Sequence, residues 1–134
     1  MSINLREFVS NLAKATKEKQ INWAKVSPKF LNNAMERIDD DDRVFEAYST
    51  TNKNEDVVVI GRAERKVYTS EDEYNMADYY FLTQTDTNYK DRVTFHEQDT
   101  EFGYYGFAID LARLYRLIKI NYMDTGNKFK NFLE

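Results

Sequence analysis

The first helix-like pattern lies near the N-terminus. Side chains that can pack on one helix face recur there at three- and four-residue spacing: Leu5, Phe8, Val9, Leu12 and Thr16. Asn4, followed three residues later by Glu7, has the spacing of a capping box, in which each side chain satisfies a backbone N–H of the first turn. We therefore predict a helix over residues 5–19 with one packed face and one basic face.

A second helical segment follows a short connector that contains Ile21 and Trp23. Ser27 before Pro28 is typical of a helix start, because proline at the first helical position loses no hydrogen bond. Apolar side chains share one face as far as about Ile38. The acidic run at 39–42 then ends the helix, since short carboxylates repel each other and compete for backbone donors.

From Arg43 the pattern changes to β-forming residues with two-residue alternation. We predict strands over residues 43–48, 57–69, 79–83 and 92–96, with Gly61 marking a bulge or bend in the second. The separators, residues 50–56, 70–75 and 86–91, are turn-rich and of hairpin length. Because they are too short for crossover helices, the sequence predicts a four-stranded antiparallel meander.

Helical spacing returns at Phe107 and continues to Tyr122. Gly126 lies where a left-handed cap would end this long helix, and a short tail helix with Phe129 and Phe132 would follow. The expected fold is α+β in one domain over residues 1–134. We expect its helices to cover one sheet face and the other face to be polar, acidic and rich in tyrosine.

Composition excludes several classes of protein. The 134 residues include 20 aromatic side chains and no cysteine, so a packed core is expected and disulfides, thiolate nucleophiles and Cys-ligated metals are excluded. The longest apolar run, Val57 to Ile60, is far below the ~18 residues of a membrane span, and the charged N-terminus does not resemble a secretory signal. We expect a cytoplasmic protein that contacts no membrane.

The charges are unevenly distributed along the chain. Residues 1–29 and 112–134 together carry a net charge of +7, whereas residues 30–111 carry −11. This asymmetry would either create oppositely charged surfaces that steer partners or be neutralised internally, with basic helices packed over an acidic sheet.

No catalytic template is complete. His96, the single histidine, lies beside Glu97, Asp99 and Glu101, which suggests a small hydrolase or lyase as one alternative function. Neither acidic segment, residues 39–42 or 86–91, has the glycine and terminal glutamate of a calcium-binding loop. We therefore predict no catalytic residue, no metal and no cofactor.

A second alternative function is nucleic-acid binding through the C-terminal helix. Arg113, Arg116 and Lys119 recur at three-residue spacing there and could contact phosphates if they were exposed. The sequence pI of about 5.1 and the acidic sheet argue against this function, because both would repel nucleic acid.

The segment most typical of a binding surface is acidic and tyrosine-rich. Tyrosine buries a large rigid area and keeps a hydroxyl for hydrogen bonding, and neighbouring carboxylates attract basic partners. We predict partner-binding residues Glu71, Asp72, Glu73, Tyr74, Asp78, Tyr79 and Tyr80. The leading hypothesis is a non-catalytic module that masks a basic protein, as toxin-neutralising immunity proteins and phage inhibitors of host defence do. An exposed aromatic face could equally form a homodimer interface.

Overall fold

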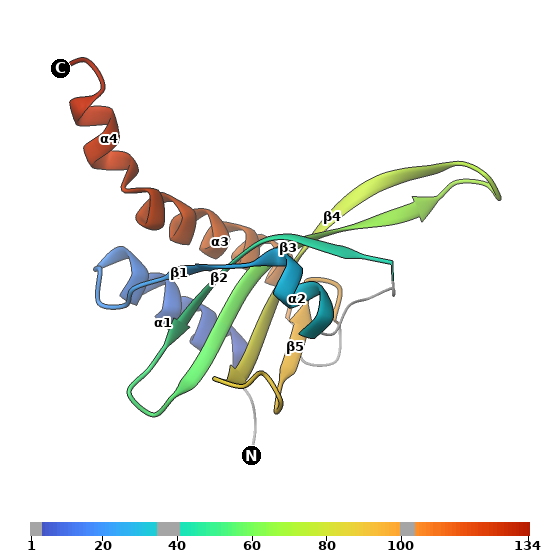
Figure 1. Cartoon of the computed structure of the whole chain (residues 1–134), viewed down its shortest axis with the longest axis horizontal. Coiled ribbons are helices and arrows are strands. Elements are labelled where there is room, and N and C mark those ends of the chain that lie inside the picture. The colour runs from blue at the N-terminus through green and yellow to red at the C-terminus, as the bar shows by residue number, and fades with distance from the viewer. Residues whose placement is uncertain (1–3, 35–40, 100–103) are drawn as a thin grey trace.

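The computed structural model describes residues 4–34, 41–99 and 104–134 and has an α+β fold (Figure 1). The elements in chain order are α1 (Leu5–Lys17), β1 (Ala24–Val26), α2 (Pro28–Ala34), β2 (Arg43–Thr51), β3 (Asp56–Tyr68), β4 (Tyr74–Asp86), β5 (Val93–His96), α3 (Phe107–Met123) and α4 (Thr125–Asn131). The strands pair antiparallel in chain order. The α+β class, the antiparallel sheet and the C-terminal helices are confirmed.

The sheet has five strands rather than four. The additional strand, β1, lies in the segment that the sequence suggested was a connector, and it pairs with β2 from Ala24↔Ser49 to Val26↔Ala47. A strand of three residues is too short for two-residue alternation to show. The end of predicted helix 28–38 and part of the acidic run 39–42 lie outside the described residues.

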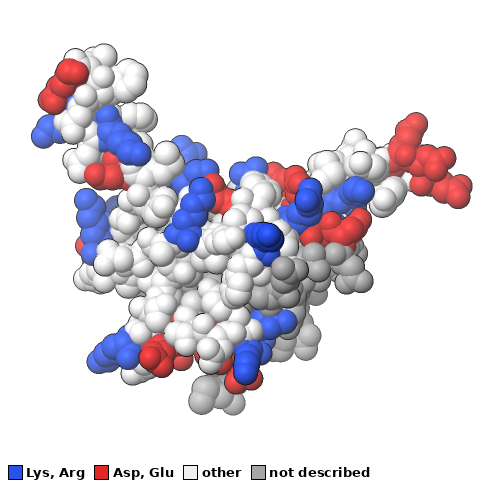
Figure 2. Space-filling model, viewed as in Figure 1, with Lys and Arg blue, Asp and Glu red and all other residues white. Residues whose placement is uncertain are grey.

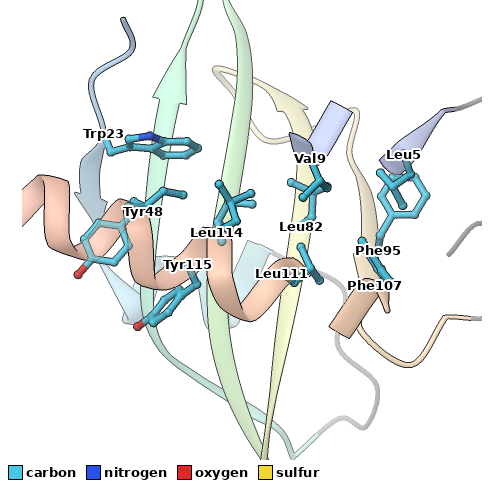
Figure 3. Close-up of a cluster of buried hydrophobic side chains, with 12 residues drawn as sticks. Leu5, Val9, Trp23, Tyr48, Leu82, Phe95, Phe107, Leu111, Leu114 and Tyr115 are labelled. Atoms are coloured by element: carbon cyan, nitrogen blue, oxygen red, sulfur yellow. The ribbon is translucent and has the colours of Figure 1, made fainter. Parts of the chain in front are cut away.

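Helices α1 and α3 cover one face of the sheet (Figure 3). Asn4 starts α1 as predicted, because its side chain accepts from the Glu7 N–H at 3.0 Å and donates to the Glu7 carboxylate at 3.0 Å. The core on this face consists of buried side chains from both helices and the sheet: Leu5, Val9, Trp23, Tyr48, Ile60, Leu82, Phe95, Phe107, Leu111, Leu114, Tyr115 and Ile118. The Trp23 indole donates to Thr16 Oγ1 at 3.0 Å, so its polar atom is satisfied inside this core.

The opposite face carries a second apolar cluster, so the expectation that it is polar and acidic is wrong. Leu31 of α2 packs there against buried sheet residues: Val44, Ala47, Val57, Val59, Ala63, Tyr79 and Phe81. The Asn32 side chain fixes α2 to β2, because it accepts from the Val44 N–H at 2.7 Å and donates to the Val44 carbonyl at 3.1 Å. The strands are therefore covered on both faces in the middle of the sheet.

Two glycines have roles that differ from those predicted. Gly61 lies within the continuous strand β3, and the bulge is instead on β2 between Val44 and Glu46. Gly126 lies inside α4, and the left-handed residue between α3 and α4 is Asp124, with φ of 52°. Asp tolerates this conformation better than most residues, because its short polar side chain can bond locally; the Asp124 carboxylate accepts from Asn127 Nδ2.

A network of polar side chains around the half-buried Glu46 attaches α3 to the sheet. The Glu46 carboxylate accepts hydrogen bonds from the Tyr115 hydroxyl and from Lys119 Nζ, the latter at 2.9 Å, and Lys25 Nζ lies 3.7 Å away. Burial alone would raise the pKa of Glu46, but the bonds from Tyr115 and Lys119 hold it below its ordinary value.

Along the described residues, none of the helices is both long and apolar enough to cross a membrane.

Candidate functional site

The β3–β4 hairpin projects beyond the rest of the sheet (Figure 1). Its strands pair continuously from Asp56↔Asp86 to Tyr68↔Tyr74. The neighbouring strands stop earlier, because β2 begins opposite Glu64 and the register of β5 ends opposite Phe81. Residues 65–77, here called the arm, therefore form a two-stranded ribbon, and no other strand of the described residues pairs with it on either side.

The end of the arm is strongly acidic (Figure 2). Residues 69–73, here called the tip, form a turn in which the Thr69 N–H donates to the Glu73 carbonyl at 2.9 Å. Glu71, Asp72 and Glu73 are all exposed at this turn. Among the described residues, none of these three carboxylates takes part in an ion pair. Their field is therefore directed outward into solvent.

One face of the arm carries exposed large side chains behind the acidic tip. Tyr68, Tyr74 and Met76 are 57%, 46% and 50% exposed. The two tyrosine rings lie 5.5 Å apart between centroids, and Lys66 Nζ lies 4.8 Å from the Tyr74 ring centroid. These contacts hold the rings in place while leaving about half of each available, which reduces the entropy lost when they are buried by a partner.

An ion pair braces the base of the arm. Arg62 donates to the Asp78 carboxylate at 2.7 Å, and its guanidinium lies 4.6 Å from the centroid of the Phe45 ring. Asp78 is thus partly neutralised. Asp78 should contribute less to the affinity for a partner than the carboxylates at the tip do, because a cation of the partner would compete with Arg62.

The predicted partner-binding residues separate into two groups. Glu71, Asp72, Glu73 and Tyr74 come together at the end of the arm, and Asp78 lies at its base. The inclusion of Tyr79 is wrong, because this side chain is fully buried and donates to the Asp42 carboxylate at 2.8 Å.

Tyr80 is not a surface residue of the arm either. It is half-buried on the face under α3, where its ring centroid lies 5.2 Å from that of Tyr115. Sequence reasoning missed three residues that belong to the arm surface: Lys66, Tyr68 and Met76. Cross-strand pairing could have identified them, because a turn over residues 69–73 places Tyr68 opposite Tyr74 and Lys66 opposite Met76.

The surroundings of His96 give little support to the hydrolase or lyase alternative. Its ring packs edge-on against the buried Tyr79 ring at 5.5 Å, and its backbone N–H donates to the Asp99 carboxylate at 2.8 Å. Glu97 instead accepts from the Tyr80 N–H at 3.1 Å, and burial raises the pKa of Glu97. None of the main surface hollows along the described residues is lined by His96. Glu101 lies outside the described residues.

The basic residues of α3 do not form one phosphate-binding row. Lys119 is paired with Glu46, whereas Arg113 and Arg116 are exposed. The charge asymmetry of the sequence is therefore neutralised internally at Glu46 but retained at the surface elsewhere. Within the described ranges, no three His, Asp or Glu side chains are grouped so that they could hold a metal ion.

Comparison with known proteins adds no further assignment. No family model, no curated protein and no solved structure matches the chain.

Proposed function

We propose that this protein is a binding module that masks a basic protein partner with its arm. The observation that carries the proposal is the combination, at the end of a projecting hairpin, of the exposed carboxylates of the tip with the exposed tyrosine pair Tyr68 and Tyr74. A projecting ribbon of this kind reaches into a concave site more easily than a flat sheet does.

The acidic tip supplies attraction and orientation. Its carboxylates lie close together and away from other charges, so their potentials add on the outward side. Such a field increases the rate of encounter with a basic partner and is screened over about 8 Å at physiological ionic strength. Binding should therefore weaken as salt rises.

The aromatic face supplies most of the buried area. Tyr68, Tyr74 and Met76 are large and sit on a paired ribbon rather than on a loose loop. Tyrosines at the centre of an interface commonly cost 2 kcal/mol or more when truncated to alanine. Tyr74→Ala is therefore expected to weaken binding, while costing the fold less than about 0.5 kcal/mol because the residue is outside the core.

Toxin-neutralising immunity proteins and phage-encoded inhibitors of host defence systems act by covering a partner in this way. We propose one of these settings for the protein, in the cytoplasm and without catalysis. The proposed masking function rests on the acidic tip and the aromatic face of the arm. The proposed biological setting rests on the protein's size and charge.

The test compares three forms of the purified protein as bait in nuclease-treated lysate. These are the wild type, an arm-reversed variant (Glu71→Lys, Asp72→Lys, Glu73→Lys) and a control variant with the same change in charge elsewhere (Glu18→Lys, Glu55→Lys, Asp91→Lys). All six positions are exposed. We expect a stoichiometric basic protein with the wild type and the control variant, and its loss with the arm-reversed variant or at several-fold higher salt.

Equal capture by all three forms would show that the arm is not the binding surface. Recovery of nucleic acid alone, when nuclease is omitted, would favour the α3 alternative instead. In that case substitution of the exposed Arg113 and Arg116 should reduce recovery and lower its salt dependence.

A further inference from the structure

The C-terminal helix α4 projects from the end of α3, and none of the described residues covers its apolar side. No residue of α4 is buried; Phe129 is 77% exposed, and Phe132 and Leu133, which follow the last helical residue, Asn131, are 81% and 92% exposed. Their spacing of three and four residues places them on one side of the helical turn. An apolar group of this size at the surface is typical of an interaction site.

Basic side chains flank this apolar side. Lys128 and Lys130 lie one position before and one after Phe129, so they border the exposed rings. The tip has the opposite charge, and the arm has exposed apolar groups of its own. The tip is therefore complementary in charge to Lys128 and Lys130, and both projections offer uncovered aromatic side chains (Figure 2).

The two projections cannot meet within one chain, because they point away from the body at its opposite ends (Figures 1 and 2). They can meet between two chains. A two-fold axis would set α4 of each copy against the arm of the other, because every contact in such a dimer occurs twice.

We propose that two copies of this chain form a two-fold dimer in which α4 of each copy packs on the arm of the other. In each contact Phe129, Phe132 and Leu133 cover the face that carries Tyr68, Tyr74 and Met76, and Lys128 and Lys130 approach the carboxylates of the tip. The inference goes beyond the proposed function because it needs no foreign protein. In this dimer α4 has the basic and aromatic chemistry expected of the proposed partner protein. The partner protein and the second copy of the chain would therefore compete for the arm.

The area available is sufficient for a stable dimer. A buried aromatic side chain contributes about 150–250 Å². Because these groups are already partly covered in one chain, about 100 Å² each is a reasonable average. Two symmetric contacts, each with six large side chains of which four are aromatic, then bury about 1,200 Å², the lower end of specific interfaces, before the charged rim is added. One contact alone would be too small, so the symmetry is needed.

The test uses charge reversal on each side of the contact, measured by analytical ultracentrifugation of the purified protein. The arm-reversed variant has a basic arm and a basic α4. A tail-reversed variant (Lys128→Glu, Lys130→Glu) has an acidic arm and an acidic α4. Each variant repels itself at both contacts, so we expect its dimer to weaken about tenfold or more. An equimolar mixture has complementary charges at both contacts and should form a mixed dimer of about wild-type affinity.

The control variant and its lysine counterpart (Lys53→Glu, Lys90→Glu) should dimerise as the wild type does, because they change exposed charges that belong to neither the arm nor α4. Circular dichroism of each variant shows whether it is folded. A wild type that stays monomeric at about 200 µM would overturn the proposal. So would a dimer that survives both reversals, or two folded variants that fail to form the mixed dimer.

Failure of the dimer is distinguishable from failure of the proposed function. The ultracentrifuge experiment contains no foreign protein. The tail-reversed variant keeps the acidic arm and should capture a basic partner at least as well as the wild type. A monomeric wild type that captures a partner would therefore remove only the dimer. A dimeric wild type whose monomeric tail-reversed variant captures no partner would remove only the masking function.

Discussion

Gly61→Ala is expected to destabilise the fold, although alanine is ordinarily the better residue in a strand. Gly61 pairs directly with Phe81 across β3 and β4, and the Phe81 ring covers it. A Cβ at this position would lie 2.2 Å from Phe81 Cζ, 2.6 Å from Phe81 Cε1 and 3.0 Å from Ala47 Cβ. Phe81 and Ala47 are both fully buried, so neither can move into solvent to make room.

The expected magnitude follows from two opposing effects. Replacing glycine by alanine reduces the entropy of the unfolded chain and would stabilise an open site by about 0.4–1 kcal/mol. Overpacking a closed core usually costs about 1–3 kcal/mol through displaced rings and strained rotamers. At a separation of 2.2 Å the second effect should dominate. We expect a net loss of about 1–3 kcal/mol, a large part of the 5–15 kcal/mol typical of a domain.

Urea unfolding followed by tryptophan fluorescence measures this loss. Trp23 is the single tryptophan and is buried in the core under α1 and α3, so its emission reports on global unfolding. The midpoint should fall with little change in slope. Gly126→Ala is the matched control, because a methyl group there meets nothing within 4 Å. It should leave the midpoint unchanged and add helix content.

A second substitution tests the steric cause directly. If the Phe81 ring is responsible, Phe81→Leu should cost less in the Gly61→Ala background than in the wild type, because the two residues are in contact and their effects are not additive. A midpoint that is unchanged or raised by Gly61→Ala, or strict additivity with Phe81→Leu, would refute the reasoning.

Three further predictions concern buried polar groups. Tyr79→Phe leaves the Asp42 carboxylate without the Tyr79 hydroxyl and should lower the free energy of unfolding by about 1.5–3 kcal/mol in the same urea assay; a loss below 0.5 kcal/mol would contradict this. The pKa of Glu46 is held below its ordinary value of 4.5, so the contribution of Glu46 to stability is present above that pH and is lost as the pH falls below it. Glu46→Gln should therefore reduce the loss of unfolding free energy at acid pH. An equally large loss in the variant would be inconsistent with the network around Glu46. Burial raises the pKa of Tyr48 from 10.0 to about 12, so the stabilising effect of its neutral hydroxyl is complete below pH 10 and is lost between pH 10 and about 12. Tyr48→Phe should reduce the fall in unfolding free energy over that interval. An equally steep fall in the variant would argue against this cause.

Local signals allowed much of the fold to be predicted. The Asn4 and Glu7 spacing placed the start of α1, Pro28 placed the start of α2, and strand alternation with hairpin-length separators gave the antiparallel meander. Each of these features depends on residues close together in sequence. Hydrogen bonds and turn geometry of that kind are specified by a few neighbouring side chains.

The burial of Tyr79 could not be predicted because its signal is not local. Strand β4 contains Tyr79, Tyr80 and Phe81 in succession, so alternation does not show which side chain faces inward. Both faces of the sheet are apolar at this point, since α2 covers one and α3 the other. The burial of Tyr79 depends on Asp42, thirty-seven residues earlier, which is a tertiary contact. The position of the turn, in contrast, was indicated by the turn-rich residues 70–75, and the pairing of Tyr68 with Tyr74 shows which side chains share a face of the arm.

The distribution of charge explains why the arm and α4 point to binding rather than to stability. Where opposite charges could be brought together, the fold does so, as at Glu46 with Lys25 and Lys119. The tip and α4 instead keep their charges at opposite ends of the molecule and expose aromatic side chains beside them. Neither region contributes to the two apolar clusters. Both can therefore be altered with little cost to the fold, and a strong effect of such changes on association would reflect the surfaces themselves.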